Sequence, residues 1–255
     1  MSAIPIESPS RPRATQQRAV GQDRMIRALV ATLMLAGIPL FAVFVARSLV
    51  PLDARGALFA LLGGVGGLLV IDLVTGIVHW ACDTWGDERT PLVGPTLIRS
   101  FIEHHRMPQK MLEHDWIEVN REPALAVLIA LVILTLPGPE RALEGQPLLA
   151  GFLASLALSG ALANQLHQWA HMPRPPRLVR GLQRAGLVMD ARRHARHHRV
   201  PHVQAYCIAT GWLNPPLDAL EFWRGLERQV SRCTGQAPRT ARRSGGMERQ
   251  EDRAG

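Results

Sequence analysis

Histidine is the residue type whose spacing in this chain points most directly to chemistry. All ten histidines lie in two windows of 36 residues each, 79–114 and 167–202. His167 and His171 are four residues apart, a spacing that puts both imidazoles on one helix face, where they can bind one metal ion or two neighbouring ions. Ten imidazoles exceed the four ligands of a tetrahedral zinc ion but suit two irons with about eight or nine nitrogen ligands and an open position for oxygen. We therefore expect a two-metal centre, with one or two of the ten not touching metal, built from His79, His104, His105, His114, His167, His171, His194, His197, His198 and His202.

Carboxylates and one amide near the histidines are expected to orient these ligands. Asp72 and Asp83 lie two turns before and one turn after His79, on the same face of a helix. A charged side chain at membrane depth costs roughly 2.5 to 3.5 kcal/mol by insertion scales, so Asp72 should face the interior with a partner. Orienting a ligand and satisfying another buried polar group are equally compatible with its position. The residues expected to support the ligands are Asp72, Asp83, Asp115 and Asn164.

Arginine carries almost all of the positive charge, because Lys110 is the only lysine in a chain of net charge +8. The basic residues flank apolar runs, where they would meet anionic lipid headgroups, and this placement argues against nucleic acid as a partner. Arg192, Arg193 and Arg196 are expected to face the headgroup of a lipid substrate. The three cysteines are widely spaced without a Cys-x-x-Cys motif, so neither a zinc ribbon nor a disulfide framework is indicated.

Four apolar runs predict the helices that position the histidines: residues 28–46, 56–82, 123–137 and 147–170. A run of about 20 residues crosses the hydrocarbon layer as a helix, and the third run, at about 15 residues, is expected to be tilted or partly buried. Gly63, Gly64, Gly66 and Gly67 would let another helix approach the second run closely. Most of the six tryptophans lie near the expected interfaces, as in an aromatic belt. The predicted fold is an all-α membrane protein with about four transmembrane helices and a cytoplasmic, histidine-rich cap that holds two metal ions.

The distribution of arginine also predicts orientation. Five arginines precede the first run, so the positive-inside rule places the N-terminus in the cytoplasm, and four crossings return the chain there. Both histidine windows then lie on the cytoplasmic side of a multi-pass membrane protein. Residues 1–24 and 231–255 are poor in large apolar side chains, and we expect them to be disordered tails around a membrane-embedded domain at 25–230.

Several motifs together resemble one family of lipid-modifying enzymes. The chain resembles the plasmanylethanolamine desaturases of the Kua/CarF type over roughly residues 68–225, and more distantly a plant plastid desaturase that acts on phosphatidylglycerol. The motifs include Asp72 to Trp80, Asp83-Thr-Trp-Gly86, Glu103-His-His105, His114-Asp115, Asn164 to His171, His194 to His202 and Thr210 to Asn214. The family's two histidine boxes fall on residues 167–171 and 194–198. One departure is a single histidine, His194, where the family has an adjacent pair.

The resemblance implies an oxygen-dependent, di-iron, membrane-bound enzyme. Such an enzyme converts the 1-O-alkyl chain of an ether phospholipid, plasmanylethanolamine, to the 1-alkenyl (vinyl ether) chain of a plasmalogen. Oxygen is a co-substrate, and no catalytic residue is expected beyond the metal centre. The sequence contains neither a His-Pro-Gly-Gly haem segment nor a Gly-x-Gly-x-x-Gly nucleotide loop, so electrons must come from a separate protein of the cytochrome b5 or ferredoxin type.

Two other functions fit parts of the pattern. An acyl-lipid desaturase or hydroxylase, for example one acting on phosphatidylglycerol, would use the same metal core on a different chain. A membrane electron-transfer protein with a bis-histidine haem would also need paired histidines, but it predicts them near the middle of facing helices, whereas here they crowd at the ends of the apolar runs.

Overall fold

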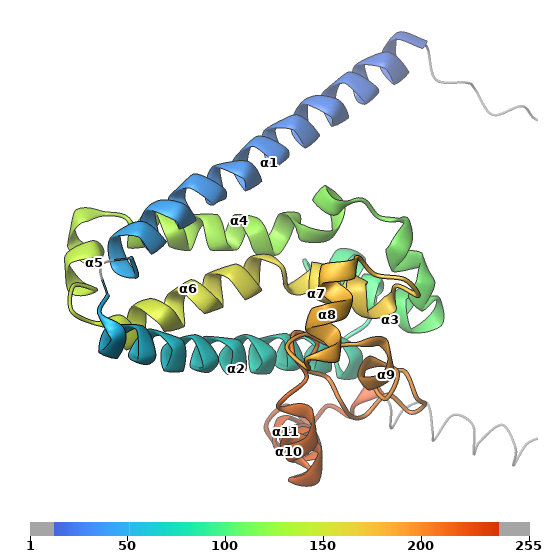
Figure 1. Ribbon diagram of the computed structural model, residues 1–255. Coiled ribbons are helices and arrows are strands. Elements are labelled where there is room, and N and C mark those ends of the chain that lie inside the picture. The colour runs from blue at the N-terminus through green and yellow to red at the C-terminus, as the bar shows by residue number, and fades with distance from the viewer. Residues whose placement is uncertain (1–12, 51, 240–255) are drawn as a thin grey trace, which may run out of the picture.

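The computed structural model describes residues 13–50 and 52–239, with side chains from residue 24 onward except at residue 140. Every regular element in these residues is helical, which confirms the all-α part of the expected fold (Figure 1). The larger helices are α1 (Arg13–Ser48), α2 (Ala54–Thr84), α4 (Trp116–Leu134), α6 (Pro147–Ala161), α7 (Ala163–His171) and α11 (Phe222–Thr234). The shorter ones are a π-helix (Gly94–Ile98), α3 (Arg99–Arg106), a 3-10 helix (Pro108–Glu113), α5 (Pro137–Ala142), α8 (Arg177–Arg184), α9 (Ala191–His194) and α10 (Asn214–Ala219).

Both expected tails overlap helices. The first helix begins at Arg13, inside the segment that we expected to be disordered, and α11 continues to Thr234. Residues 1–12 and 240–255, the outer parts of both tails, lie outside the described residues.

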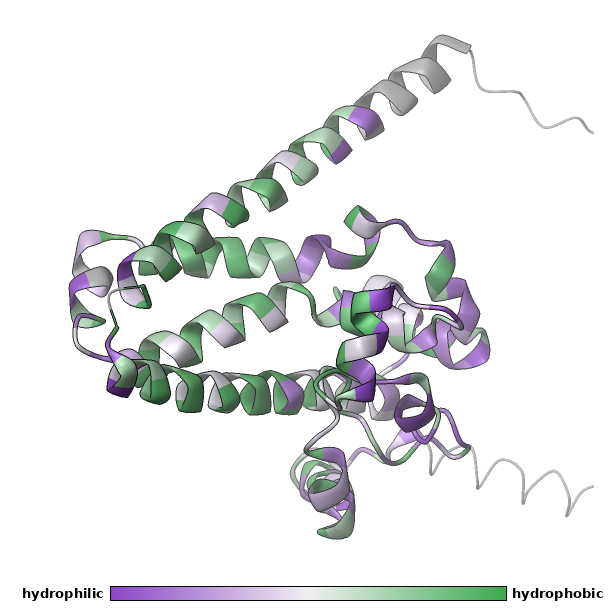
Figure 2. Cartoon of the chain, viewed as in Figure 1, coloured by the Kyte–Doolittle hydropathy of each residue, from purple (hydrophilic) through white to green (hydrophobic). Residues whose placement is uncertain are grey.

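Two helices in the described part of the chain are long and apolar enough to cross a membrane, Arg24–Ser48 within α1 and Ala54–Thr84. Helices α6 and α7 pass the same test together, with a 52° bend between them. In α4, three charged residues (Glu118, Arg121 and Glu122) occupy the first turns, and the apolar stretch after them is short. Figure 2 shows apolar residues along most of these helices, in green. The protein is therefore a membrane protein, with two or three spans by length and composition.

Glycine allows α2 and α6 to pack with their backbones in contact. A Cβ atom at Gly63 would lie 1.9 Å from the carbonyl oxygen of Leu148, and one at Gly151 would lie 1.9 Å from that of Ala60. At Gly67 it would lie 2.5 Å from the carbonyl oxygen of Phe152. The predicted close approach is confirmed at Gly63 and Gly67, whereas the space beside Gly64 and Gly66 leaves room for a Cβ atom. Figure 1 shows α2, α4 and α6 side by side, with α1 joining them near its C-terminal end.

The start of α4 is fixed by a capping box. The Asp115 carboxylate accepts hydrogen bonds from the backbone N–H groups of Ile117 and Glu118, and the Glu118 carboxylate accepts one from Asp115 N–H. Arg27 of α1 forms ion pairs with both carboxylates. Asp115 therefore caps α4 and links it to α1, in place of the ligand-orienting role that we expected.

Helices α10 and α11 fold back against the C-terminal part of α2. Their contact is an aromatic cluster in which Trp80, Tyr206 and Trp223 are buried together with Cys207. Trp223 is 2% exposed and Trp80 6% exposed, so these two indoles belong to the protein core, and the expected aromatic belt is wrong for them.

Candidate metal centre

One end of the helical bundle collects nine of the ten histidines. The C-terminal end of α2 supplies His79, α3 supplies two histidines and α7 supplies two. The segment from α9 to the following loop supplies the other four. Figure 1 shows these elements meeting at the same end of the bundle. Their side chains form two adjoining groups whose ligand atoms lie within 4.8 Å of one another in each group.

The first group, group A, consists of five histidines: His104, His167, His171, His194 and His198. The Nε2 atom of His194 lies 2.9 Å from Nε2 of His167 and of His171, and 3.0 Å from that of His198. The His104 ring lies against this set, with its centroid 4.6 Å from those of His167 and His171. Four imidazole nitrogens thus converge on one point, with a fifth ring beside them.

The second group, group B, combines three histidines with a carboxylate: His79, Asp83, His105 and His197. Asp83 Oδ1 lies 2.9 Å from His105 Nε2, and Oδ2 lies 3.3 Å from His197 Nε2 and 3.5 Å from His79 Nε2. His79 and His197 are fully buried, and the Asp83 side chain is only 6% exposed. Asp83 was expected to orient ligands; the structure puts its oxygen atoms among the ligand atoms themselves.

The other two histidines, His202 and His114, lie outside the two groups. His202 lies beside group B, with its ring centroid 4.4 Å from that of His105, and its Nδ1 donates a hydrogen bond of 3.1 Å to the carbonyl oxygen of His197. His114 is exposed, and its Nδ1 lies 3.4 Å from Glu118 at the start of α4. The structure therefore brings eight predicted histidines into the two groups, places His202 next to them and leaves His114 outside.

The hydrogen-bonding state of these side chains fits bound metal. A neutral imidazole has one donor and one acceptor, so several Nε2 atoms that face one another cannot all be satisfied by mutual hydrogen bonds. Two nitrogens bound at right angles to one ion, each about 2.1 Å from it, lie about 3 Å apart, which matches the spacing in group A. Several buried ligand atoms of the two groups also have no hydrogen-bond partner, among them Nε2 of His79, Nε2 of His104 and Oδ2 of Asp83. A cation in each group would satisfy these atoms.

Burial also keeps the imidazoles outside the membrane helices ready to bind metal. Removal from water, reinforced by neighbouring imidazoles, lowers the pKa of His104 to about 3 and that of His198 to about 2. It also lowers the pKa of His194 well below the ordinary value for histidine. A metal ion binds the neutral form of imidazole, so these side chains need lose no proton before binding at neutral pH.

A buried carboxylate on α2 fixes the turn that follows the second histidine window. Asp72 is fully buried, and its carboxylate accepts hydrogen bonds from the backbone N–H groups of Thr210 and Gly211, both at 2.9 Å, and of Leu213 at 3.2 Å. Of its two expected roles, the structure shows the second, a partner for buried backbone polar groups. This contact holds the segment after the second histidine window against α2.

Arg193 and Asp190 hold α9 in place. Asp190 caps the helix, and Arg193 donates hydrogen bonds to the Asp190 carboxylate and to the carbonyl oxygens of Thr210 and Val188. Arg193 was expected to face a lipid headgroup, but its guanidinium is directed inward and stabilises α9, which carries His194. Arg192 is exposed, and Arg196 is 44% exposed and lies 3.6 Å from Asp218.

A chain of side-chain amides links α7 to the end of the first histidine window. The sequence analysis missed it. Asn120 donates to the Gln165 side chain, Gln165 donates to Gln168, and Gln168 donates to the carbonyl oxygens of Met111 and His114. Gln165 and Gln168 lie in the same helix as the His167–His171 pair, and this proximity was the available signal. Asn164, expected to support a ligand, instead donates to the carbonyl oxygen of Val119 and ties α7 to α4.

Fold and site together define a class: a helical membrane protein with a buried polyhistidine and carboxylate cluster, able to hold metal ions, at one end of its apolar helices. A comparison with protein families then identifies the group. Residues 68–241 match the lipid desaturase domain family, so the chain belongs to this family, whose members are desaturase enzymes. The matched segment contains all ten histidines.

Individual proteins in this family match over most of the chain. The plasmanylethanolamine desaturase of Myxococcus xanthus is 36% identical over 242 residues, covering 94% of this chain and 84% of that protein. Plasmanylethanolamine desaturase 1 of Mus musculus is 39% identical, covering 70% of this chain and 68% of that protein. The chloroplastic fatty acid desaturase 4 of Arabidopsis thaliana is 35% identical, covering 80% of this chain and 62% of that protein. No solved structure matches the chain.

Proposed function

We propose that this enzyme is a di-iron plasmanylethanolamine desaturase that forms the vinyl ether double bond of plasmenylethanolamine. The observation that carries the proposal is the pair of adjoining, buried ligand groups at one end of the apolar helices. The names of the Myxococcus xanthus and Mus musculus relatives, at 36% and 39% identity, supply the substrate. The reaction removes one hydrogen from each of carbons 1 and 2 of the alkyl ether chain, and with O₂, two electrons and two protons it yields the alkene and two water molecules.

The two groups provide a complete ligand set for two irons. The five histidines of group A would hold one ion, and His79, Asp83, His105 and His197 would hold the other. His202, hydrogen-bonded to the His197 backbone, would orient group B and is near enough to bind after a small movement. Iron supplies the oxygen activation and the hydrogen abstraction that no side chain of the protein can perform.

The protein positions the lipid and excludes water. The apolar faces of α1, α2, α4 and α6 offer a hydrocarbon environment for the alkyl chain up to the level of the histidines (Figure 2). Buried imidazoles with lowered pKa values, such as those of His104 and His198, keep the histidine ligands of group A neutral. Arg192 lies within the second histidine window with its side chain exposed, where it would contact the phosphate of the headgroup.

The membrane topology belongs to the same proposal. We infer four crossings, by α1, α2, α4 and the bent pair of α6 and α7, which run alternately leftward and rightward in Figure 1. Arginines before the first crossing support a cytoplasmic N-terminus, and with four crossings a cytoplasmic metal centre and C-terminus. From that side, a separate one-electron carrier of the cytochrome b5 or ferredoxin type can deliver the two electrons.

The similarity to fatty acid desaturase 4 favours a second candidate, desaturation of an acyl chain in a phospholipid such as phosphatidylglycerol. The bis-histidine haem protein is not favoured, because the chain belongs to a desaturase family and one ligand group contains a carboxylate.

Expression in a host that makes alkyl ether lipids but no plasmalogens distinguishes the two desaturases. Mild acid cleaves a vinyl ether to an aldehyde and leaves an ordinary olefin intact. We expect mass spectrometry to find acid-labile 1-alkenyl chains in cells with the wild-type enzyme and none with His171→Ala. Acid-stable, newly unsaturated acyl chains without any vinyl ether would contradict the proposal and favour the acyl-lipid reaction.

A further inference from the structure

The proposed reaction needs two electrons per double bond, and the route by which they enter has no assigned position on the protein. The inference below rests on the proposed function. Because each carrier protein delivers one electron, two docking events are needed in each turnover. Electron tunnelling weakens steeply with distance and is more efficient through bonded atoms than through gaps. The entry point should therefore be a surface with a short, well-packed connection to one of the two ligand groups.

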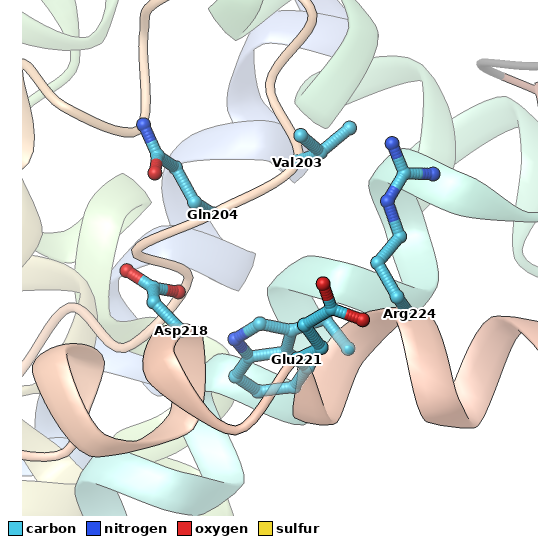
Figure 3. Close-up of a pocket in the computed structure, with 6 residues that line it drawn as sticks. Val203, Gln204, Asp218, Glu221 and Arg224 are labelled. Atoms are coloured by element: carbon cyan, nitrogen blue, oxygen red, sulfur yellow. The ribbon is translucent and has the colours of Figure 1, made fainter.

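One recess on the surface has such a connection. It lies between the loop after the second histidine window and helices α10 and α11, and Figure 3 shows side chains around it. Its lining consists of Val203, Gln204, Asp218, Glu221, Trp223 and Arg224. This recess is on the outer side of the segment whose inner side supplies group B.

The first connection runs through the backbone. His197, a fully buried member of group B, donates a hydrogen bond of 2.9 Å from Nδ1 to the carbonyl oxygen of Gln204. Its Nε2 atom faces the group, 3.2 Å from His105 Nε2 and 3.3 Å from Asp83 Oδ2. The recess is thus separated from a proposed iron ligand by one hydrogen bond and the Gln204 peptide group.

The second connection runs through packed aromatic rings. The Trp223 ring centroid lies 5.0 Å from that of Tyr206, the only tyrosine in the sequence. Tyr206 is fully buried and lies between Trp223 and group B, with its ring centroid 5.0 Å from that of His197 and 6.1 Å from that of His79. The two connections begin at neighbouring parts of the recess lining and end at the same histidine.

The charge around the recess selects the kind of partner. Arg224 is 46% exposed at its edge, and Arg228, one turn further along α11, is also exposed. Arg196, at 44% exposure, lies beside Asp218 of the lining, and Arg199 is exposed on the adjoining loop. Three acidic residues lie in or beside the recess: Asp218 and Glu221 of the lining, and Glu227, which forms an ion pair with Arg224. The four cations exceed them by one positive charge. Opposite charge steers association between proteins, so this surface favours an acidic partner.

We propose that this recess is the docking site of an acidic one-electron carrier protein, and that electrons pass from it to the metal centre at group B by way of Gln204 and His197, with Trp223 and Tyr206 as the parallel path. In each docking event the carrier is oxidised by one electron and one ferric ion is reduced to the ferrous state. Two such events return both irons to the state that reacts with oxygen.

The test compares two double variants with the same change in charge. Arg224→Gln/Arg228→Glu alters the edge of the recess, and the glutamine keeps a hydrogen-bond donor near Glu227. Arg180→Gln/Arg184→Glu is the matched control, because these arginines are also four residues apart and exposed, but on α8, outside the recess lining.

Each iron-loaded protein, in nanodiscs of neutral phosphatidylcholine, is mixed with a reduced acidic [2Fe–2S] ferredoxin, and iron reduction is followed by stopped-flow spectroscopy. Dithionite replaces the ferredoxin in a parallel series, and ferredoxin binding is also measured on metal-free protein.

We expect the recess variant to be reduced by ferredoxin about tenfold more slowly than wild type at low ionic strength, a change typical of a steered association. The difference should shrink as salt is added, ferredoxin binding should weaken in parallel, and reduction by dithionite should not change. The control variant should match wild type in every series. If the double variant fails to load iron, the single variants Arg228→Glu and Arg184→Glu are compared by the same criteria.

Equal reduction by ferredoxin in the recess and control variants would overturn the proposal. So would a recess variant that keeps its reduction rate and instead loses binding to vesicles containing phosphatidylserine, because the arginines would then face lipid. Failure of the proposed function gives a different result: the wild-type protein would bind no iron and show no spectral change with dithionite.

Discussion

His171 and His198 show how strongly the metal centre depends on single side chains. Both belong to group A and reach it from different elements, His171 from α7 and His198 from the segment after α9. Removing either imidazole leaves an ion with one ligand fewer and leaves the remaining buried nitrogens without a partner. In contrast, His114 lies at the exposed start of α4, outside both groups.

We predict that His171→Ala and His198→Ala abolish product formation while leaving membrane insertion intact. The loss should exceed the roughly 10- to 100-fold effect of removing a residue that only orients a ligand. Metal analysis of the purified proteins should show a deficit of about one ion per chain. His114→Ala is the control and should retain metal and product; full activity in either group A variant would refute the ligand assignment.

Two adjacent arginines should respond differently to substitution. Arg193 donates side-chain hydrogen bonds to Asp190, Thr210 and Val188, so Arg193→Ala leaves two carbonyl oxygens and the Oδ2 atom of Asp190 without their donor. We predict a loss of about 2 kcal/mol in unfolding free energy, in the range for hydrogen bonds from a charged group. Arg192→Ala should leave stability unchanged and only weaken lipid affinity. Thermal unfolding in detergent and a lipid-binding titration measure the two effects, and equal melting temperatures for the two variants would contradict this distinction.

The helices position the site through contacts that small residues permit. Gly151 of α6 faces the backbone of α2 at Ala60, while a Cβ atom at Gly37 in α1 would meet nothing within 4 Å. We predict that Gly151→Ala forces α2 and α6 apart and lowers the melting temperature. The added Cβ atom would overlap the α2 backbone at Ala60, which can move away only if the whole helix moves. Gly37→Ala, the same chemical change, should have no such effect. If both variants have the melting temperature of the wild type, the close packing of α2 and α6 is not required for stability.

Much of this arrangement could be predicted from sequence, for reasons visible in particular elements. The apolar runs that became α1 and α2 and the glycines at 63 and 67 have local signatures, and the spacing of His167 and His171 is fixed by the helix that carries them. The separation of the histidines into two groups had no local signature, because it depends on how α3, α7 and α9 pack. The partner of Asp72 is 138 residues away in sequence, so its backbone contact with Thr210 could not be foreseen. Asp83 and Asp115 look alike in sequence, yet one lies among ligand atoms and the other caps α4.

Burial of many imidazoles at one place also makes the stability of the metal-free protein depend on pH. Burial lowers the pKa of His104 to about 3 and that of His198 to about 2, whereas the same side chains in an unfolded chain have pKa values of about 6.5. Below about pH 6.5 the unfolded chain binds protons that the folded chain does not, so the free energy of unfolding decreases as the pH falls toward 3.

We predict that the melting temperature of the metal-free protein decreases steadily between pH 7.5 and pH 5, measured by circular dichroism in detergent. A bound metal ion holds the imidazoles unprotonated, so the iron-loaded protein should melt at a higher temperature at each pH in this range. A metal-free protein whose melting temperature is constant or rises on acidification would contradict the inferred burial of neutral histidines.

The central claim is that two irons are held by histidines that come from both halves of the chain. The most direct measurement is the metal content of the purified wild-type protein in lipid nanodiscs, determined by mass spectrometry of the metal together with a protein assay. The proposed function predicts two iron ions per chain in the wild type and fewer in His105→Ala and His171→Ala, which remove one ligand from each group. A wild-type protein without stoichiometric iron, or variants that retain both ions, would contradict it.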